Sequence, residues 1–502
     1  MLAPSASALP VSLLAATIVV TGCGRAGRSA GPVSAADVEA TRVFCGACHL
    51  FPAPDTFPQF AWPEHVKQGY VFADRSGRRL PRPSLEAATA WYVDNAPAAL
   101  SLPDRSASPG DLGLKLVRRG AAIPGRPPIP HVSDVRVVEL AAGRPGVLIC
   151  ECDPLENTGA VHFYEPAADR WTALCEMPGP ARAEVVDLDR DGIPDVLAAC
   201  LGSFFPTDDR VGGLVWLRGR EDGGFAPFTL LKDIGRTADV RAADFDGDGE
   251  TDILVAEFGW NAIGGVRLLR NRTHDWSRPA FEMSTVEPRT GCARVSVADL
   301  DAEGRSDFVA LFCQEHESVV AFLNRGDGRF HSETIFTGPH PGYGSSAIDL
   351  ADIDGDGDLD VAYGNGDVLQ DPFVLRPYQG VAWLENKGGF PFAFHRLADL
   401  PGVHGIVATD VEGDGDLDIV ATSYVPAEEL NPEALDLTSV LVLEQTERGE
   451  FARRRLETKT CNHFTCAAGD PWGDGRRTIV VGNFYSTTRR PIERMIDLWE
   501  PE

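Results

Sequence analysis

The sequence predicts a mainly β protein in which a small α-helical domain precedes a seven-bladed β-propeller. An acidic loop of constant spacing recurs at intervals of roughly 48 to 60 residues, a period typical of propellers and repeat arrays. Seven copies can be traced, and each repeat divides into four short segments whose alternation and β-branched residues favour strands. Upstream of the repeats, a Cys-x-x-Cys-His motif at residues 45–49 lies between two segments with helical patterns.

The composition limits the classes of partner. The chain has 502 residues, of which 43% are hydrophobic, and this is enough for two globular domains. Its 46 Lys and Arg residues are outnumbered by 74 Asp and Glu residues, which gives a net charge of −28. Nucleic acids and anionic lipid surfaces require basic protein surface, so we expect neither as a general partner.

The N-terminal residues predict export. Residues 9–20 form an apolar run of about 12 residues, which has the length of a signal-peptide core and is too short to span a bilayer. The run ends in Val20-Thr21-Gly22-Cys23, which resembles the bacterial lipobox, whose cysteine is lipidated. We predict a signal peptide at 1–23, a tether at 24–36, and a periplasmic or cell-surface protein that contacts the membrane only through a lipid on Cys23. No Lys or Arg precedes the run, so a plain signal peptide is the alternative.

Residues 37–103 predict a haem domain. In the C-x-x-C-H pattern, the thiols of Cys45 and Cys48 attach haem c and His49 ligates the iron. A redox disulfide or half of a zinc site would use similar residues, but neither a thioredoxin-like βαβ pattern nor a second C-x-x-C pair accompanies the motif. With predicted helices at 34–44 and 84–94, the segment resembles a small class I cytochrome c. That resemblance implies one haem c that passes single electrons.

The sequence leaves two alternatives for the second axial ligand of the iron. Small cytochromes c usually use methionine, but the chain's methionines all lie outside the haem domain, at Met1, Met177, Met283 and Met495. His65 is the substitute that we name, and an open or water-bound iron is the alternative. The choice matters because bis-His ligation favours a lower potential than Met/His, whereas an open site permits ligand binding.

A strand that precedes the first repeat predicts how the ring closes. The last repeat ends at residues 495–500, which match a third strand, so its fourth strand is missing from the C-terminus. Residues 114–123, within a linker at 104–130, have the pattern of a fourth strand. We predict that they pair with 495–500 and close a propeller of residues 131–502, because closure removes exposed sheet edges.

The acidic loops predict Ca²⁺ sites. In the copy that begins at Asp352, acidic residues occupy positions 1, 3, 5 and 9, and Gly357 occupies position 6. Ca²⁺ takes roughly six to eight oxygen ligands, and the glycine permits a sharp turn around the ion. An EF-hand is excluded, because position 12 is not acidic in any copy and a strand follows the loop. Acidic turns without metal are the alternative.

Five copies supply the predicted metal ligands. They are Asp187, Asp189, Asp191, Asp195, Asp244, Asp246, Asp248, Asp252, Asp299, Asp301, Glu303, Asp307, Asp352, Asp354, Asp356, Asp360, Asp410, Glu412, Asp414 and Asp418. A worn copy begins at Asp470 and a degenerate one at Glu139. The loops resemble the FG-GAP or VCBS repeats of integrin-α-type propellers, which implies about five structural Ca²⁺ ions that stiffen the blades. Together with the haem motif, they resemble haem modules fused to such propellers in exported bacterial proteins.

The face opposite the acidic loops carries the candidate binding residues. Long connections between second and third strands hold Phe204, Phe205, Trp260 and Tyr424, which either form a binding surface or pack under the loops. Four histidines, His131, His340, His404 and His463, precede the first strands of blades that neighbour one another in a ring. We expect them at one side of the channel mouth, as a transition-metal or catalytic site or as loop residues bonded to carbonyls.

Three functions are consistent with these features. The first is a lipid-anchored redox protein, whose haem domain passes electrons and whose propeller docks a partner protein or a small ligand. The second is an oxidoreductase, in which a propeller-face site oxidises a carbohydrate or another small molecule and the haem accepts the electrons. Only the histidines support an enzyme. The third is an adhesion or glycan-binding propeller.

Overall fold

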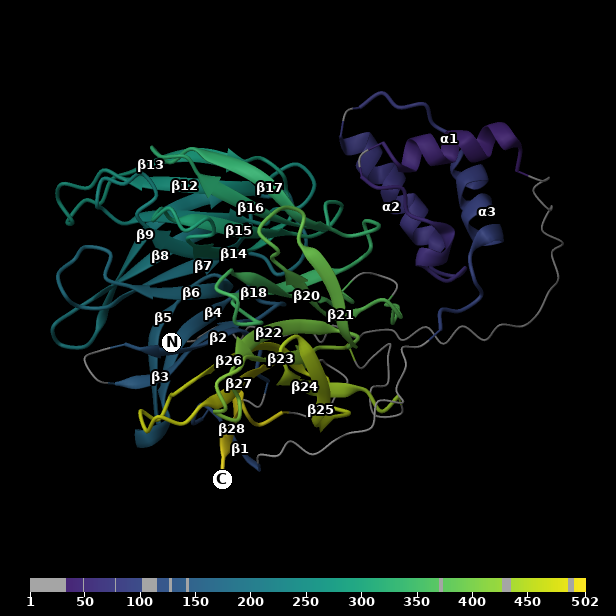
Figure 1. Cartoon of the computed structure of the whole chain (residues 1–502). Helices are drawn as coiled ribbons and strands as arrows, with labels where there is room; N and C mark the ends of the chain where they lie inside the picture. The colour runs from purple at the N-terminus through teal and green to yellow at the C-terminus, as the bar shows by residue number, and fades with distance from the viewer. Residues whose placement is uncertain are drawn as a thin grey trace, which may run out of the picture.

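The computed structural model describes residues 33–47, 49–76, 78–101, 115–125, 129–140, 144–369, 373–426, 435–485 and 492–502. The described residues between 33 and 101 form a group of helices, which we call the helical module, and those from 115 onward form a seven-bladed β-propeller (Figure 1). The predicted mainly β fold and the seven-bladed propeller are therefore confirmed. None of the helices in the described part of the chain is long and apolar enough to cross a membrane.

Serine caps begin two helices of the module. The helical elements are α1 (Ala35–Cys45), the 3₁₀ turn η1 (Pro54–Thr56), α2 (Trp62–Arg75) and α3 (Leu85–Asn95). Ser34 Oγ accepts a hydrogen bond from the Asp37 amide (3.2 Å), and Ser84 Oγ accepts one from the Ala87 amide (3.1 Å). Both capped helices were predicted. The helix α2 was not, although Pro63 in its first turn is a helix-start signal.

Aromatic side chains fill the interior of the module. Trp62 and Tyr92 stack with their ring centroids 3.9 Å apart, and Phe44 packs on Tyr70 at 4.7 Å. All four are buried, so apolar burial holds the short helices together. Three short helices around such a core are not specific to cytochromes, and the identity of the module therefore depends on its site residues.

Each blade is a four-stranded antiparallel sheet, and six of the seven are built from consecutive strands. The strands are β2 (Val132–Glu139), β3 (Pro145–Cys152), β4 (Gly159–Glu165) and β5 (Arg170–Glu176) in blade 1; β6 (Pro180–Val186), β7 (Asp195–Cys200), β8 (Gly212–Gly219) and β9 (Phe225–Ile234) in blade 2; β10 (Thr237–Ala243), β11 (Asp252–Glu257), β12 (Gly265–Asn271) and β13 (Phe281–Glu287) in blade 3; β14 (Cys292–Ala298), β15 (Asp307–Phe312), β16 (Ser318–Asn324) and β17 (Phe330–Thr337) in blade 4; β18 (Ser345–Ala351), β19 (Asp360–Asn365), β20 (Gly380–Glu385) and β21 (Ala393–Asp399) in blade 5; and β22 (Val403–Thr409), β23 (Asp418–Ser423), β24 (Thr438–Glu447) and β25 (Glu450–Thr458) in blade 6.

The seventh blade joins the two ends of the propeller. It contains β26 (His463–Gly469), β27 (Thr478–Asn483), β28 (Ile496–Pro501) and, on its outer edge, β1 (Leu116–Ala121). Ala121 pairs with Ile496, and the antiparallel register runs to Leu116 and Pro501 (Figure 1). This is the pairing predicted from residues 114–123 and 495–500. It leaves no blade with an unpaired fourth strand.

Buried ion pairs reinforce the closure. Arg118 of β1 donates to Asp497 of β28 (Nη2 to Oδ2, 2.7 Å) and contacts Glu457 of blade 6 (Nη1 to Oε1, 2.9 Å). The Asp497 side chain is fully buried and that of Glu457 nearly so. The strand β1 therefore supplies a cation to two buried carboxylates, one in blade 7 and one in blade 6.

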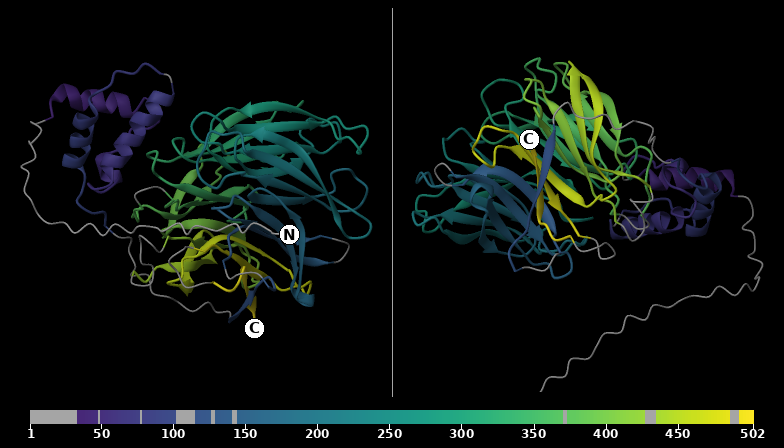
Figure 2. Two further views of the ribbon diagram at one scale, coloured as in Figure 1. Left: turned by 180° about the vertical axis from the view of Figure 1, so that it is seen from behind. Right: turned by 90° about the horizontal axis from the view of Figure 1, so that it is seen from below.

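The connections between strands define two faces of the propeller. The acidic loops join first to second strands on one face, and the connections from second to third strands and from blade to blade lie on the other. The helical module lies beside this second face (Figure 2), and contacts described below join the two. Around the propeller axis, first-strand charges pair with one another, as in Arg182 with Asp134 (2.9 Å) and Arg241 with Asp239 (2.6 Å).

Replacing Arg118 with Ala is expected to lower the free energy of unfolding by about 2 to 4 kcal/mol, because buried carboxylates would lose a cationic partner. Lys115→Ala is the matched control, since Lys115 pairs with Glu502 where both side chains are exposed. That control is expected to cost less than about 1 kcal/mol. Urea denaturation of both variants measures the difference, and equal losses would contradict the role of Arg118 in closure.

Candidate functional site

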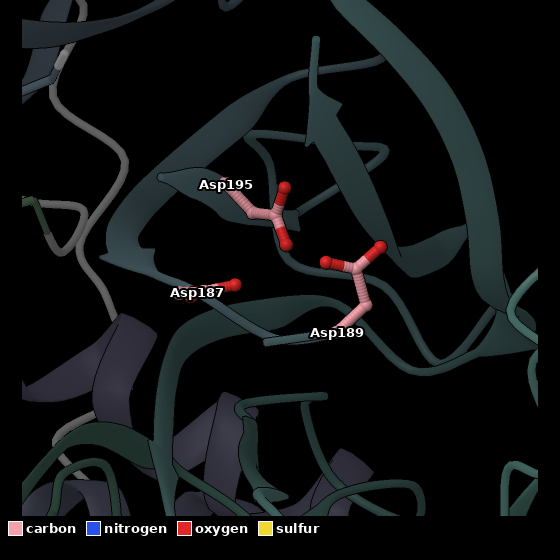
Figure 3. Close-up of side chains that lie close together, drawn as sticks. All are labelled: Asp187, Asp189 and Asp195. Carbon is pink, nitrogen blue, oxygen red and sulfur yellow. The ribbon is translucent and has the colours of Figure 1, made fainter. Parts of the chain in front are cut away.

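Four of the acidic loops bring carboxylates together. In each, oxygens from three side chains lie within 4.8 Å of one another. The groups are Asp187, Asp189 and Asp195; Asp244, Asp246 and Asp248; Asp299, Asp301 and Asp307; and Asp352, Asp354 and Asp356. Figure 3 shows the first group, whose carboxylates point toward a shared space. Convergent carboxylate oxygens are the donors that Ca²⁺ prefers.

Backbone amides fix the shape of each loop. Asp352, at position 1, accepts hydrogen bonds from the amides of Asp356 (2.9 Å) and Gly357 (2.9 Å), and Asp356 accepts one from the Asp358 amide (2.9 Å). The worn copy makes the same turn, because Asp470 accepts from three amides. The glycine at position 6 has a positive φ in all six copies, at Gly192, Gly249, Gly304, Gly357, Gly415 and Gly475. Glycine is favoured there because other residues rarely adopt that conformation.

The carboxylate at position 9 anchors the loop to the third strand of its blade. Asp360 accepts from the Ile353 amide (3.1 Å) inside the loop and from the Asn386 amide (2.7 Å) after β20. The other copies make the same two bonds through Asp195, Asp252, Asp307 and Asp418. Burial raises the pKa of Asp360 to about 6, although these bonds favour its ionised form. Position 9, predicted only as a metal ligand, therefore has a structural role of its own.

The carboxylates at position 3 face arginines from the hairpin turns. Arg272 lies 3.0 Å from Asp246 in its own blade, and Arg448 of blade 6 lies 3.3 Å from Asp354 of blade 5. The Asp354 side chain is only 7% exposed, and its Oδ1 is buried without a hydrogen-bond partner. A cation in the loop would satisfy that oxygen, so the residues fit Ca²⁺.

The fifth predicted loop differs from the other four. Position 3 of this loop is Glu412, whereas the other four copies have aspartate, which has a shorter side chain. Glu412 shares a hydrogen bond with Asp418. Burial and this neighbouring carboxylate raise the pKa of Glu412 to about 8. The loop is not among the convergent groups found in the described residues. Four loops, rather than five, therefore present a ready set of ligands.

The C-x-x-C-H motif lies at the C-terminal end of α1. Cys45 is half-buried, burial raises the pKa of its thiol, and the Tyr92 hydroxyl is its hydrogen-bond neighbour. His49 Nδ1 lies 2.8 Å from the Leu50 carbonyl oxygen. A carbonyl only accepts, so Nδ1 carries the proton and Nε2 keeps its lone pair. Burial lowers the pKa of His49, which favours the neutral ring that ligates metals. Cys48 and Cys23 lie outside the described residues.

His65 lies on α2 with one ring nitrogen unsatisfied. Its ring stacks on Phe57, with the centroids 4.0 Å apart and the planes inclined by 28°. Nε2 is buried without a hydrogen-bond partner. Burial lowers the pKa of His65 to about 4, and the nearby Arg376 guanidinium lowers it further. A neutral imidazole with a free nitrogen fits the second axial ligand, and this role stays a prediction.

The helical module contacts propeller loops from three adjacent blades. Near blade 5, the Tyr378 hydroxyl donates to the Thr56 carbonyl (3.4 Å), and Val374 packs into the module's apolar core. Near blade 3, Phe72 meets Trp260 edge to face at 5.9 Å, and the Arg75 guanidinium lies 5.0 Å from the Trp260 ring. The helix α2 therefore spans part of the face opposite the acidic loops.

A histidine of blade 4 faces the same side of the module. His316, between β15 and β16, lies near enough to His49 that a charge on the His49 ring would disfavour protonation of His316 and lower its pKa. Burial, followed by the Arg289 guanidinium, lowers the pKa of His316 to about 4. The C-x-x-C-H motif is thus near the propeller.

The four predicted histidines pack in different side-chain environments. His404 stacks on Phe464 at 4.5 Å, and His131 meets Phe484 edge to face at 5.2 Å. His463 Nε2 is held by Glu457 (3.0 Å), and His340 packs on a different ring, that of Tyr378. No convergent group in the described residues contains a histidine. Phenylalanine rings lie between the imidazoles of His131 and His404, so the metal or catalytic alternative for the four histidines has no convergent geometry behind it and stays a prediction.

The predicted loop aromatics divide into three environments. Tyr424 is buried, and Phe204 stacks on Phe484 at 5.6 Å, so both pack under the loops. Trp260 contacts the helical module instead of a free ligand. Phe205 is 55% exposed. The sequence identified these positions, but it gave no sign of Phe57, Gly342 and Arg376, which also lie at the interface between the module and the propeller.

Comparison with known proteins identifies the repeats. The FG-GAP-like repeat family matches residues 187–255, 244–310 and 299–363, and each match begins at the first aspartate of an acidic loop. Human (Homo sapiens) cartilage acidic protein 1 is 29% identical over 191 residues, and the mouse (Mus musculus) protein of that name is 23% identical over 190 residues. Each match spans 36% of this chain and 28% of the relative. The chain therefore contains FG-GAP-like repeats in a seven-bladed propeller.

Two solved structures are among those similar to this chain, and the first of them supports the fold alone. An ancestral GH74 enzyme superimposes with a TM-score of 0.50 and 10% sequence identity, covering 81% of this chain and 52% of that one. The Vibrio cholerae (V. cholerae) biofilm matrix protein Bap1 has a TM-score of 0.42 and 11% identity, covering 77% of this chain and 91% of that one.

Replacing Asp360 with Ala is expected to destabilise the protein by about 2 to 4 kcal/mol, because two buried amides would lose a charged acceptor. Asp358→Ala is the control, since Asp358 occupies position 7 of the same loop and is exposed. Its cost is expected to stay within about 0.5 kcal/mol. Thermal unfolding in the presence of a chelator measures both, and similar losses would contradict the anchoring role of position 9.

Proposed function

We propose that the protein is an exported haem c electron-transfer protein. In this proposal the helical module binds the haem, and the propeller, stabilised by Ca²⁺, docks a redox partner or a small ligand. Cleavage of the signal peptide and lipidation of Cys23 would hold it at a membrane in the periplasm or at the cell surface. The observation that carries the proposal is the pair of histidines in the module, each with a ring nitrogen suited to iron.

Each residue of the module has a defined part in this proposal. Cys45 and Cys48 would hold the group through thioether bonds, and His49 would ligate the iron through Nε2, oriented by its bond to the Leu50 carbonyl. When bound, haem c supplies one-electron redox chemistry. The buried rings of Trp62 and Tyr92 would exclude water from the site.

The propeller contributes a rigid support. The four convergent acidic loops would bind Ca²⁺ on the face away from the module, where the ions would hold first and second strands together. FG-GAP-like repeats and the seven-bladed ring support a binding or docking role for this domain. Loops of the other face, around blades 3 to 5, already contact the module.

Protein expressed with a cytochrome c maturation system is expected to show a c-type α-band in its reduced-minus-oxidised spectrum. Cys45→Ser should remove one thioether bond and shift or abolish that band. Cys175→Ser, at a half-buried cysteine of the propeller, is the control and should leave it unchanged. A wild-type spectrum without haem would overturn the redox proposal.

Calcium is expected to raise the melting temperature of the chelated protein. Each site would stabilise it by about 2.7 kcal/mol when the ion is at 100 times its dissociation constant. Asp354→Asn should reduce the measured stoichiometry from about four ions by one, whereas Asp358→Asn in the same loop should not. Isothermal titration calorimetry counts the ions, and an unchanged count in Asp354→Asn would argue against binding at that loop.

An adhesion or glycan-binding propeller is the second candidate. Phe205, exposed on a loop of blade 2, offers an aromatic ring on which a sugar could stack. The four histidines that would support an oxidoreductase with its own active site on the propeller are not part of any convergent ligand group in the described residues, so that alternative has less support than the other two. Glycan binding that depends on Phe205, in protein without covalent haem, would favour the second candidate.

A further inference from the structure

We infer that the propeller sets the position of His65 through Phe57, so that docking of the helical module determines whether His65 serves as an iron ligand. This inference rests on the proposed haem function. It assigns Phe57 as a positioning residue and the propeller loops around Gly342 and Arg376 as the surface that holds it.

Phe57 lies between His65 and the propeller. On the module side, its ring stacks on the His65 imidazole at 4.0 Å. On the propeller side, the Arg376 guanidinium lies 5.1 Å from the ring centroid. Gly342 touches the ring edge so closely that a Cβ at this position would lie 2.6 Å from Phe57 Cζ. The ring therefore cannot move toward the propeller, and the propeller limits where His65 can lie.

The propeller side of this contact is rigid. Arg376 Nη1 donates to the Gly342 carbonyl (2.8 Å), and the Tyr378 hydroxyl lies 3.2 Å from the same oxygen and shares its one proton between this carbonyl and that of Thr56. The Arg376 side chain is fully buried. These contacts hold the backbone of Gly342 in place. The Phe57 ring therefore packs against a main chain that cannot easily move away.

The module side anchors the backbone of Phe57 but leaves the ring dependent on the propeller. Trp62 Nε1 lies within hydrogen-bonding distance of the Phe57 carbonyl (3.1 Å) and the Pro54 carbonyl (2.8 Å). Those bonds hold the main chain near the start of α2. Phe57 is nevertheless only 5% exposed, and propeller residues form part of its cover. Undocking would expose the ring and remove its support against His65.

The contact between Phe57 and the propeller matters for function because the His65 ring depends on it for its position. His65 Nε2 is buried without a hydrogen-bond partner, so no polar group among the described residues holds that nitrogen in place. Its position then depends on α2 and on the stacked Phe57 ring. In the docked state we expect His65 to be held as the second axial ligand. In the undocked state we expect a labile site that admits small ligands such as carbon monoxide.

The test uses Gly342→Leu in the full-length, haem-loaded chain. Gly342 has an ordinary backbone conformation, and the three atoms nearest to its Cβ position all belong to the Phe57 ring, so the substitution acts first on that contact. Gly389→Leu is the matched control, because nothing lies within 4 Å of its Cβ position and its backbone is also ordinary. We expect Gly342→Leu to enlarge the radius of gyration in small-angle scattering and to raise carbon monoxide affinity by about tenfold or more. Gly389→Leu should change neither.

A double variant that also lacks His65 distinguishes an effect on the position of His65 from a general loosening of the haem site. His65→Ala alone should convert the six-coordinate spectrum to one that responds to carbon monoxide. In that background, Gly342→Leu should still enlarge the protein but add no further carbon monoxide affinity, because its target ligand is gone. If Gly342→Leu does not accumulate as folded protein, Gly342→Ala repeats the measurement with a smaller group at the same contact.

Several results would overturn the inference without touching the haem proposal. One is an unchanged spectrum in His65→Ala. Another is an unchanged carbon monoxide affinity in Gly342→Leu, whether or not the scattering changes, since leucine fits only if Phe57 moves. An equal gain of affinity in Gly342→Leu with and without His65 would also overturn it. Absence of covalent haem from the wild type would instead overturn the proposed function, and the inference with it.

Discussion

The pairing of β1 with β28 is the constraint on which the rest of the structure depends. It joins residues separated by almost the whole propeller, and it places the cation of Arg118 beside Asp497 inside the ring. Closure gives the last blade its fourth strand, and the blades support one another through their buried second strands. The loops of blades 3 to 5 can then act together as one surface for the helical module. An open ring would let those blades shift relative to one another.

Sequence reasoning succeeded where a local pattern had a direct geometric meaning. The spacing of Asp352 and its equivalents predicted the repeats, and a last repeat without a fourth strand predicted the pairing of its third strand with residues near 116–121. The acidic loops themselves were predicted only in part. Asp360 occupies a ligand position, but its bonds to two amides depend on where the third strand ends, and the loop motif does not encode that.

The sequence was least informative where contacts join distant segments. It placed His404 and His131 on one side of the channel mouth, but it could not show that the rings of Phe464 and Phe484 pack between them. The interface around Phe57 had no sequence signal at all. Gly342 matters there because it has no side chain to displace the Phe57 ring, and that ring belongs to the helical module. A contact that depends on side-chain size and joins distant segments produces no repeating pattern in the sequence.

Blade 5 connects the two functional faces through covalent and hydrogen-bonded links. Asp360 begins β19 and holds the Asn386 amide just after β20, at the acidic face. At the other end of β19, Asn365 Nδ2 donates to the carbonyls of Tyr343 (3.2 Å) and Tyr378 (2.9 Å). Tyr378 in turn contacts the helical module. The two strands that fix one acidic loop therefore also fix the platform beneath Phe57. A cation in that loop would stiffen the same blade whose opposite end supports the module.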